Sequence, residues 1–248
     1  MSHGVENKER GYLVIPVRNE EESIGKVIQD ILDLCIFQRK EIIVVDNGST
    51  DKSAAIVSNF GVNVLFQPKL GYGNACLAAI AWMKNLELKP AWILICDGDG
   101  SDDPADIQKL IDCFYKESAD IVIGSRTTGV VEPGSLGFAQ RFGNSLTCVL
   151  LKLFYGKQFS DLGPLRIIRY AKLISLGLKD PTWGWNIEMH IKALQQKLKI
   201  IEIPVNYRKR RFGVSKISGN IVMVIRVGTK ILFTFFYLTL FSSSKKIR

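Results

Sequence analysis

Five apolar runs of strand length alternate with segments of helical periodicity in the first half of this chain, and this alternation limits the fold more than any other feature. Between the runs, apolar residues recur three or four positions apart, as they do in a helix with one buried face. Alternating strands and helices form βαβ units, which build a largely parallel sheet covered on both faces. The sequence therefore predicts an α/β fold. The five runs are Tyr12–Val17, Ile42–Val45, Val62–Phe66, Trp92–Cys96 and Ile121–Arg126.

The second half of the chain is less regular. A glycine-rich loop at 129–137 precedes an expected helix from Phe138 to Tyr155. We expect an edge strand at Leu165–Arg169, a helix that opens near Trp183, and a further strand at Lys199–Val205. No internal repeat is evident.

Polar residues follow each of the five runs at the point where the strand should end. In open parallel sheets, ligands bind at the carboxyl ends of the strands. Any one of these residues alone could be a helix cap or a solvated turn, but together they predict a binding site at one edge of the sheet. They are Arg18, Glu20, Asp46, Lys69, Asp97, Asp99 and Arg126.

The turn after the fourth run, Asp97-Gly-Asp-Gly100, places two carboxylates close together. Carboxylate oxygens are the ligands that hard divalent cations such as Mg²⁺ prefer, so the turn is a candidate metal site. The alternative is an ordinary acidic turn after a strand. An EF-hand is disfavoured, because its twelfth position requires Glu and this chain has Gln108 there.

The net charge of +9 is concentrated at one end of the chain. From Val205 to Arg248 there are ten Lys and Arg residues and no Asp or Glu. A basic region of this kind can bind nucleic acid, anionic lipid or a phosphorylated substrate. Nucleic acid is the least favoured partner, because the aromatic residues stand apart from the Arg208–Arg211 cluster and no nucleic-acid-binding module is visible.

The five cysteines stand singly in apolar segments, with no Cys-x-x-Cys pair. We expect them to be reduced thiols buried as small hydrophobic residues. Met1–Arg10 is polar and does not resemble a secretory signal, and both features favour the cytosolic side of a membrane.

The C-terminal segment Asn220–Phe241 is apolar apart from Arg226 and Lys230, which are four residues apart and so share one helical face. Its uncharged run, Ile231–Phe241, has eleven residues, fewer than the ~20 that a spanning helix needs. The segment therefore predicts an amphipathic helix in the membrane interface. The alternative is a core helix of a soluble domain.

Seven motifs between Tyr12 and about Gly219 together resemble the family 2 inverting glycosyltransferases of the GT-A fold, and within them the dolichyl-phosphate mannosyltransferase-like group. Asp-x-Asp alone is a weak signal, whereas this order and spacing are specific. The motifs are Pro16-Val-Arg-Asn-Glu20, Val45-Asp-Asn-Gly-Ser49, Gly71-Tyr-Gly-Asn74, Asp97-Gly-Asp99, Gly124-Ser-Arg126, Trp185-Asn-Ile-Glu188 and Arg210-Arg-Phe-Gly-Val-Ser-Lys216.

The resemblance implies a Rossmann-like GT-A domain that uses a nucleotide-sugar donor, Mg²⁺ or Mn²⁺, and a polyprenyl-phosphate acceptor. Asp97 and Asp99 would hold the metal on the donor diphosphate, where a cation neutralises charge that grows on the leaving group. Arg126, Arg210 and Lys216 would surround the phosphates. The residues implied in donor binding are Pro16, Val17, Arg18, Glu20, Asp46, Lys69, Asn74, Asp97 and Gly98.

Glu188, near the start of the helix after the sugar pocket, has two interpretations: it orients the sugar or acceptor, or it is a helix-start acid that interacts with the helix dipole. The chain departs from the family pattern at Ser101, where Gln is common. It also departs within Ser160–Arg166, where Pro164 and Leu165 replace a glycine and an aromatic residue, so the resemblance assigns no acceptor role to that segment.

We therefore expect a polar N-terminal tail at 1–10, a glycosyltransferase domain at 11–219, and an interface helix with a basic tail at 220–248. The expected activity is transfer of a hexose, mannose or glucose, from a GDP- or UDP-linked donor to a polyprenyl phosphate on the cytosolic membrane face. The alternatives are a family 2 enzyme with a small hydroxy acid or saccharide as acceptor, a sugar nucleotidyltransferase, and a non-enzymatic basic scaffold. The oligomeric state is not indicated.

Overall fold

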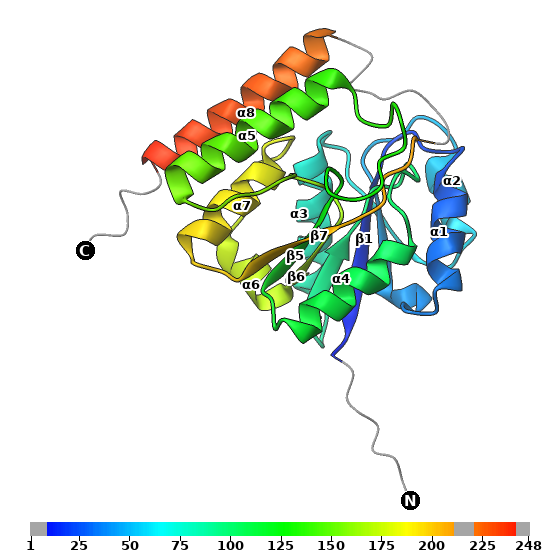
Figure 1. The fold of residues 1–248 in the computed structure, drawn as a ribbon. Helices are drawn as coiled ribbons and strands as arrows, with labels where there is room; N and C mark the ends of the chain where they lie inside the picture. The colour runs from blue at the N-terminus through cyan, green and yellow to red at the C-terminus, as the bar shows by residue number, and fades with distance from the viewer. Residues whose placement is uncertain (1–8, 211–220, 242–248) are drawn as a thin grey trace, which may run out of the picture.

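The computed structural model describes residues 9–210 and 221–241, which form one sheet with helices on both faces (Figure 1). The strands are β1 (Gly11–Val17), β2 (Ile42–Asp46), β3 (Asn63–Phe66), β4 (Trp92–Ile95), β5 (Ile121–Ser125), β6 (Arg166–Arg169) and β7 (Ile200–Pro204). The helices are α1 (Ile24–Asp33), the 3-10 turn η1 (Arg39–Glu41), α2 (Ser53–Ser58), α3 (Tyr72–Met83), α4 (Ala105–Lys116), α5 (Phe138–Tyr155), α6 (Tyr170–Leu176), α7 (Trp185–Gln195) and α8 (Ile221–Phe241).

The sheet has the strand order β3-β2-β1-β4-β6-β5-β7. β1, β2, β3 and β4 run parallel to one another, and β7 is parallel to β5. Only β6 is reversed, and it pairs antiparallel with both β4 and β5. The prediction of a mostly parallel α/β sheet is therefore confirmed.

The expected position of the Leu165–Arg169 strand was wrong. β6 lies in the interior of the sheet, not at an edge, and its Arg166 pairs in register with Ile95 and Ile123. Arg166 is fully buried, and its guanidinium donates to the carbonyl oxygens of the preceding turn, including that of Pro164 at 3.2 Å. Buried charged side chains are rare, so the arginines suggested an exposed edge that the fold does not have.

Two hydrophobic cores lie on opposite faces of the sheet. α1, α2 and α4 cover one face with side chains such as Ile28, Val57 and Leu110. α3, α6 and α7 cover the other face, and α5 and α8 lie side by side outside α7 (Figure 1). The alternating β1–α1–β2–α2–β3 arrangement leaves the carboxyl ends of the parallel strands along one edge.

α8 is a single helix of 21 residues. Its segment Val222–Phe241 is long and apolar enough, by length and composition, to cross a membrane, with a mean hydropathy of 1.5. The predicted helix at Asn220–Phe241 is present with the two cations inside it, and its predicted place in a membrane interface stays a prediction. Phe235 and Leu238 are buried, so one face of α8 belongs to the core while the other is exposed.

The described residues begin at Glu9 and resume at Ile221, so most of the expected N-terminal tail and the basic tail after Phe241 lie outside them. The five cysteines are free thiols, as expected. Cys35 is exposed and Cys113 is half-buried, however, so the expectation that all five are buried was wrong. Cys35 follows the C-terminus of α1, where the chain turns at the surface with a φ of 56°.

The start of α3 packs tightly against the loop at 180–182. The Asn74 backbone amide donates to the carbonyl oxygen of Pro181 at 2.8 Å, and the Gly73 amide donates to that of Thr182 at 3.3 Å. A Cβ atom on Gly73 would overlap the carbonyl oxygen of Asp180. Glycine is therefore required at this position by the close approach of two backbone segments.

We predict that Gly73→Ala destabilises the protein by about 1–3 kcal/mol, because the methyl group meets backbone that cannot rotate away. Thermal unfolding followed by circular dichroism should show a midpoint several degrees lower. Gly143→Ala is the matched control: Gly143 lies within α5 with no atom near its missing Cβ, so alanine should stabilise the protein by about 0.5–1 kcal/mol. Equal midpoints for the two variants would contradict the close approach at Gly73.

Candidate active site

A cleft of about 1310 Å³ opens at the carboxyl ends of the parallel strands. Most of the residues that the sequence assigned to binding the donor, the metal and the phosphates line this cleft. They come from β1, β4 and β5 and from the segment after β7 (residues 205–210), which we call the strap. The described residues of that set in the cleft are Pro16, Val17, Arg18, Glu20, Asp97, Gly98, Asp99, Arg126 and Arg210. Lys216 lies outside the described residues, so its predicted role stays a prediction.

The turn after β4 carries a concentrated negative charge. Asp99 is buried, and its Oδ1 accepts hydrogen bonds from the Ser101 amide at 2.9 Å and the Ser101 hydroxyl at 2.5 Å. Burial, together with the charges of Asp99 and Asp102, raises the pKa of Asp97 well above its ordinary value. A carboxyl group held in this way gains stability when a cation neutralises it.

Asp102 is part of this turn, and sequence reasoning missed it. One of its oxygens accepts a hydrogen bond from the Asp97 amide at 3.0 Å, while the other is buried and has no hydrogen-bond partner within residues 9–210 and 221–241. Burial is the main reason that its pKa rises to about 7. The family pattern directs attention to the Asp-x-Asp pair, but Asp102 follows only three residues after Asp99 in the same turn.

Arg210 bridges the two sides of the cleft. Its guanidinium donates to Asp99 Oδ2 at 2.8 Å and to Glu20 Oε1 at 3.1 Å. Burial alone would lower the pKa of Arg210, but the charges of Asp99 and Glu20 raise it above its ordinary value. Glu20, Asp99 and Arg210 are far apart in the sequence, which assigned all three to the site, and the structure brings them into contact.

The oxygen-rich turn fits a divalent cation such as Mg²⁺ or Mn²⁺ that is shared with a ligand. Asp97 and Asp99 are hard oxygen donors, and the Arg210 guanidinium on Asp99 shows that this carboxylate attracts positive charge. No group of three His, Cys, Asp or Glu side chains in residues 9–210 and 221–241 is arranged to hold a metal alone. Mg²⁺ commonly takes only one or two protein carboxylates and completes its shell with phosphate oxygens and water.

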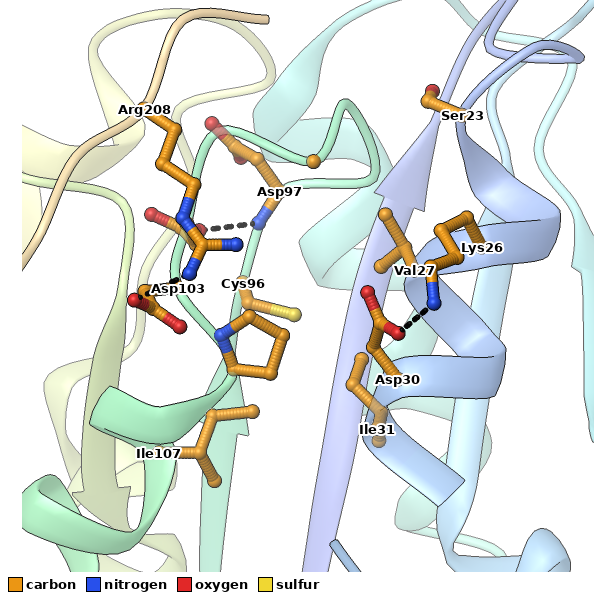
Figure 2. Close-up of a pocket in the computed structure, with 13 residues that line it drawn as sticks. Ser23, Lys26, Val27, Asp30, Ile31, Cys96, Asp97, Asp103, Ile107 and Arg208 are labelled. Atoms are coloured by element: carbon orange, nitrogen blue, oxygen red, sulfur yellow. Dashed lines mark hydrogen bonds and ion pairs between the residues drawn. The ribbon is translucent and has the colours of Figure 1, made fainter. Parts of the chain in front are cut away.

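A small cavity of about 30 Å³ lies behind this turn, between α1 and the start of α4. Figure 2 shows the Lys26–Asp30 ion pair on one side of it and the Arg208–Asp103 ion pair on the other, at 2.5 Å and 2.7 Å. The cavity has room for a water molecule but not for a nucleotide. Arg208 therefore supports the turn from behind.

Three predicted donor-binding residues do not line the cleft: Asp46, Lys69 and Asn74. Asp46 is buried and accepts the Ser49 amide at 2.9 Å, which fixes the turn after β2. Lys69 is exposed, and the Asn74 side chain donates to the Leu70 carbonyl oxygen at 3.1 Å. Their predicted contacts with the donor remain untested.

Asn47 lies in the cleft next to Asp46. Its Oδ1 accepts the Gly71 amide at 2.7 Å, and its Nδ2 donates to the carbonyl oxygens of Gln67 and Lys69. Asn47 therefore joins the loops after β2 and β3, which sequence reasoning treated as separate. The residue stands inside the Val45–Ser49 motif, so the motif contained the signal.

Arg126 is positioned by Asp161, which sequence reasoning did not assign. Its Nε and Nη2 donate to the two carboxylate oxygens at 2.7 Å and 2.8 Å, and the guanidinium carbon lies 5.1 Å from the centre of the Tyr207 ring. The fully buried Asp161 raises the pKa of Arg126 against the opposing effect of burial. The segment at 160–166 that departs from the family pattern thus fixes one cation of the cleft.

Glu188 faces away from the cleft. It is buried, accepts the backbone amides of Lys179 and Asp180 at 2.9 Å and 2.7 Å, and pairs with Lys192 at 2.6 Å. Of the two interpretations of this residue, the geometry favours a structural one, in which Glu188 holds the preceding loop. Its predicted catalytic role has no geometric support in this conformation.

α8 forms one wall of the cleft, with the cations Arg226 and Lys230 on the lining. Lys230 Nζ pairs with Asp180 at 2.7 Å, and the Thr234 hydroxyl donates to the same carboxylate oxygen at 3.2 Å. Although burial would raise it, these hydrogen bonds and that from Thr182 hold the pKa of Asp180 below its ordinary value. Both cations line the cleft, as expected if they share one helical face; Arg226 is exposed and Lys230 is half-buried.

Comparison with known proteins agrees with this geometry. Residues 12–174 match the model of the family described as glycosyl transferase family 2. An uncharacterized glycosyltransferase of Mycobacterium tuberculosis is 31% identical over 84% of this chain and 90% of its own length. The polyprenol monophosphomannose synthase of Mycolicibacterium smegmatis is 26% identical over 86% of this chain and 82% of its own.

Among solved structures, glucosyl-3-phosphoglycerate synthase from Mycobacterium tuberculosis, in complex with Mn²⁺, uridine diphosphate and glucosyl-3-phosphoglycerate, superposes with a TM-score of 0.73. The match covers 94% of this chain and 80% of that one at 18% identity. A likeness at this level of identity establishes the fold, and it confirms the GT-A architecture.

We predict that Asp99→Asn lowers kcat by roughly 10²–10³-fold, the range found when one group that stabilises transition-state charge is lost. The substitution keeps the shape of the side chain, so the thermal midpoint should change little. Mn²⁺ binding in the presence of nucleoside diphosphate, measured by calorimetry, should weaken in parallel. Asp112→Asn on the exposed face of α4 is the control. Near-normal turnover of Asp99→Asn at saturating metal would remove Asp99 from the metal site.

Proposed function

The chain belongs to glycosyl transferase family 2, and from this premise we propose that it transfers a hexose from a nucleotide sugar to a polyprenyl phosphate at the cytosolic face of a membrane. The observation that carries the proposal is the double role of α8. Arg226 and Lys230 of this helix line the cleft, and Phe233, which also lines it, begins a run of exposed apolar side chains that continues to Phe241.

Exposed apolar side chains gather along α5 and α8, and we name them the outer apolar strip. Phe154 of α5 contacts the Phe236 ring of α8 with centroids 6.3 Å apart, and Tyr237 stacks on Phe233 at 6.0 Å. Large contiguous apolar side chains that are exposed on a protein surface mark sites of interaction with a membrane or another protein. The members of the strip are Val149, Leu153, Phe154, Phe233, Phe236, Tyr237, Leu240 and Phe241.

A membrane is the partner that best explains the strip, because the same helix lines a cationic cleft. A lipid that carries a phosphate could keep its chain in the bilayer and bring its phosphate to Arg226, Lys230 and Arg126. Two relatives are named for such acceptors: the polyprenol monophosphomannose synthase above and the undecaprenyl-phosphate mannosyltransferase of Micrococcus luteus, which is 25% identical over 84% of this chain.

The reaction needs little proton transfer. The acceptor phosphate is largely ionised near neutral pH, its second pKa being about 6. One of its oxygens attacks the anomeric carbon from the face opposite the diphosphate; the new C–O bond forms as the bond to the leaving nucleoside diphosphate breaks, and the configuration inverts. A divalent cation bound by Asp97 and Asp99 would supply charge neutralisation at the diphosphate.

The side chains of the cleft position the two phosphates. Asp161 holds the Arg126 guanidinium in a fixed orientation, and arginine suits phosphate because it offers paired donors. Glu20 holds Arg210 close to Asp99 from the opposite side. Positioning and charge stabilisation, and not a general base, would then provide most of the rate enhancement.

In the decisive experiment, the purified protein is incubated in the presence of Mg²⁺ or Mn²⁺. The donors are UDP- and GDP-linked hexoses, and the acceptors are polyprenyl phosphates. We expect a glycosyl phospholipid product from one donor. A second candidate function is suggested by the solved neighbours, glucosyl-3-phosphoglycerate synthases in complex with phosphoglyceric acid, so small phosphorylated hydroxy acids belong in the same panel. Transfer to a hydroxy acid with none to any lipid phosphate would replace the proposed acceptor.

We predict that Leu153→Glu combined with Leu240→Glu releases the protein from anionic vesicles, because both side chains are exposed in the outer apolar strip. Transfer to a long polyprenyl phosphate in vesicles should fall at least about tenfold, corresponding to roughly 1.4 kcal/mol. Transfer to a short, water-soluble acceptor should not change.

The control for this pair is Leu88→Glu, which changes an equally exposed leucine outside α5 and α8. Sedimentation with vesicles measures binding directly. Point substitutions are preferable to deletion of α8, since deletion would also remove the buried Phe235 and a wall of the cleft. Vesicle binding that is insensitive to the double substitution would contradict the strip as the membrane contact.

A further inference from the structure

Asn186, the second residue of α7, lines the cleft and carries an unsatisfied polar atom. Its side chain lines the cleft beside Trp183 and Thr182. Its Oδ1 is buried and has no hydrogen-bond partner in the part of the chain that the structure describes. A buried acceptor without a partner costs about 1–3 kcal/mol, so a ligand group that donates to it would recover that cost.

A second group of this kind lies at the same end of the cleft. The hydroxyl of Tyr72 is buried and has no nitrogen or oxygen partner among the described residues. Tyr72 lines the cleft, and its ring meets the Trp185 ring edge-on with centroids 6.0 Å apart. Burial is the first cause of its raised pKa, and the charges of Cys76 and Asp97 add to it, as expected for a phenol near the β4 carboxylates.

The start of α7 lies between the start of α3 and the start of β6. Trp185 packs against Tyr72 of α3, and Arg166 of β6 donates to the Met189 sulfur at 3.5 Å. Asn47 and Val17 mark the β2 and β1 side of the cleft, Asp97 and Asp99 follow β4, and Leu162 and Pro164 precede β6 beyond β4. A donor whose diphosphate lies at the Asp97–Asp99 turn, with its nucleoside toward β2, would extend its hexose toward β6 and the start of α7.

We propose that Asn186 is a specificity-determining residue that hydrogen-bonds a hydroxyl of the transferred hexose, with Tyr72 beside it. This inference rests on the proposed function, and it assigns sugar recognition to Asn186 instead of Glu188, whose carboxylate is occupied by backbone amides. An amide both donates and accepts without ionising, so it suits a hydroxyl. A site that hydrogen-bonds a hydroxyl strongly disfavours a ligand that lacks it.

The test compares binding of a nucleoside diphosphate with binding of the corresponding nucleotide hexose, measured by calorimetry with Mn²⁺. We expect Asn186→Ala to weaken binding of the nucleotide hexose about tenfold and to leave the nucleoside diphosphate unchanged. Asn186→Leu, which keeps the size of the side chain, should behave in the same way. Asn59→Ala, at the exposed C-terminal end of α2, is the matched control.

Deoxy analogues of the donor identify the contact. The wild-type protein should lose about tenfold in affinity for the one analogue that lacks the hydroxyl facing Asn186, and Asn186→Ala should show no further loss with that analogue. If Asn186→Ala retains the full wild-type discrimination against every deoxy donor, the inference is overturned while the proposed function stands. If the wild-type protein binds no nucleotide hexose at all, both the proposed function and this inference fail.

Discussion

Negative charge at the end of β4 is the constraint on which the rest of the cleft depends. Asp97, Asp99 and Asp102 stand within one turn, and burial together with their mutual repulsion raises the pKa of Asp97. Such a cluster is stable only when cations approach it. Arg210 does so from inside the cleft and Arg208 from behind, through Asp103. Both arginines belong to the strap after β7, so their ion pairs hold the strap against the turn that follows β4.

Sequence periodicity predicted the fold well where each element has its own pattern, as for the strands at Ile42–Val45 and Ile121–Arg126 and the helix at Phe138–Tyr155. It misplaced β6, because a strand containing buried Arg166 has an edge-like composition and its stabilising carbonyl oxygens come from a turn formed only in the folded chain. It predicted the helix at Asn220–Phe241, but it could not show that this helix packs against α5 and α7.

In the candidate site, motifs identified the residues that follow strands, including Asp99, Glu20 and Arg210. They could not identify partners that meet only in space. Asp161 lies 35 positions from Arg126, and no spacing in the sequence links them. For Glu188 the sequence left two interpretations open, and the contact that favours the structural one, with the backbone amides at 179 and 180, forms only in the folded chain.

The face that α8 shares between the cleft and the outer apolar strip has a geometric consequence. Lys230, Phe233 and Tyr237 are spaced by three and four residues, so they lie along one face of the helix. Phe233 both lines the cleft and is exposed in the strip, so the strip runs into the cleft without a change of face. An α-helix rises about 1.5 Å per residue, so Lys230 and Leu240 stand roughly 15 Å apart along the axis. If the strip rests on a bilayer, as proposed, the first few isoprene units of an acceptor would cover that length, and the units beyond them would stay in the bilayer and never reach the protein.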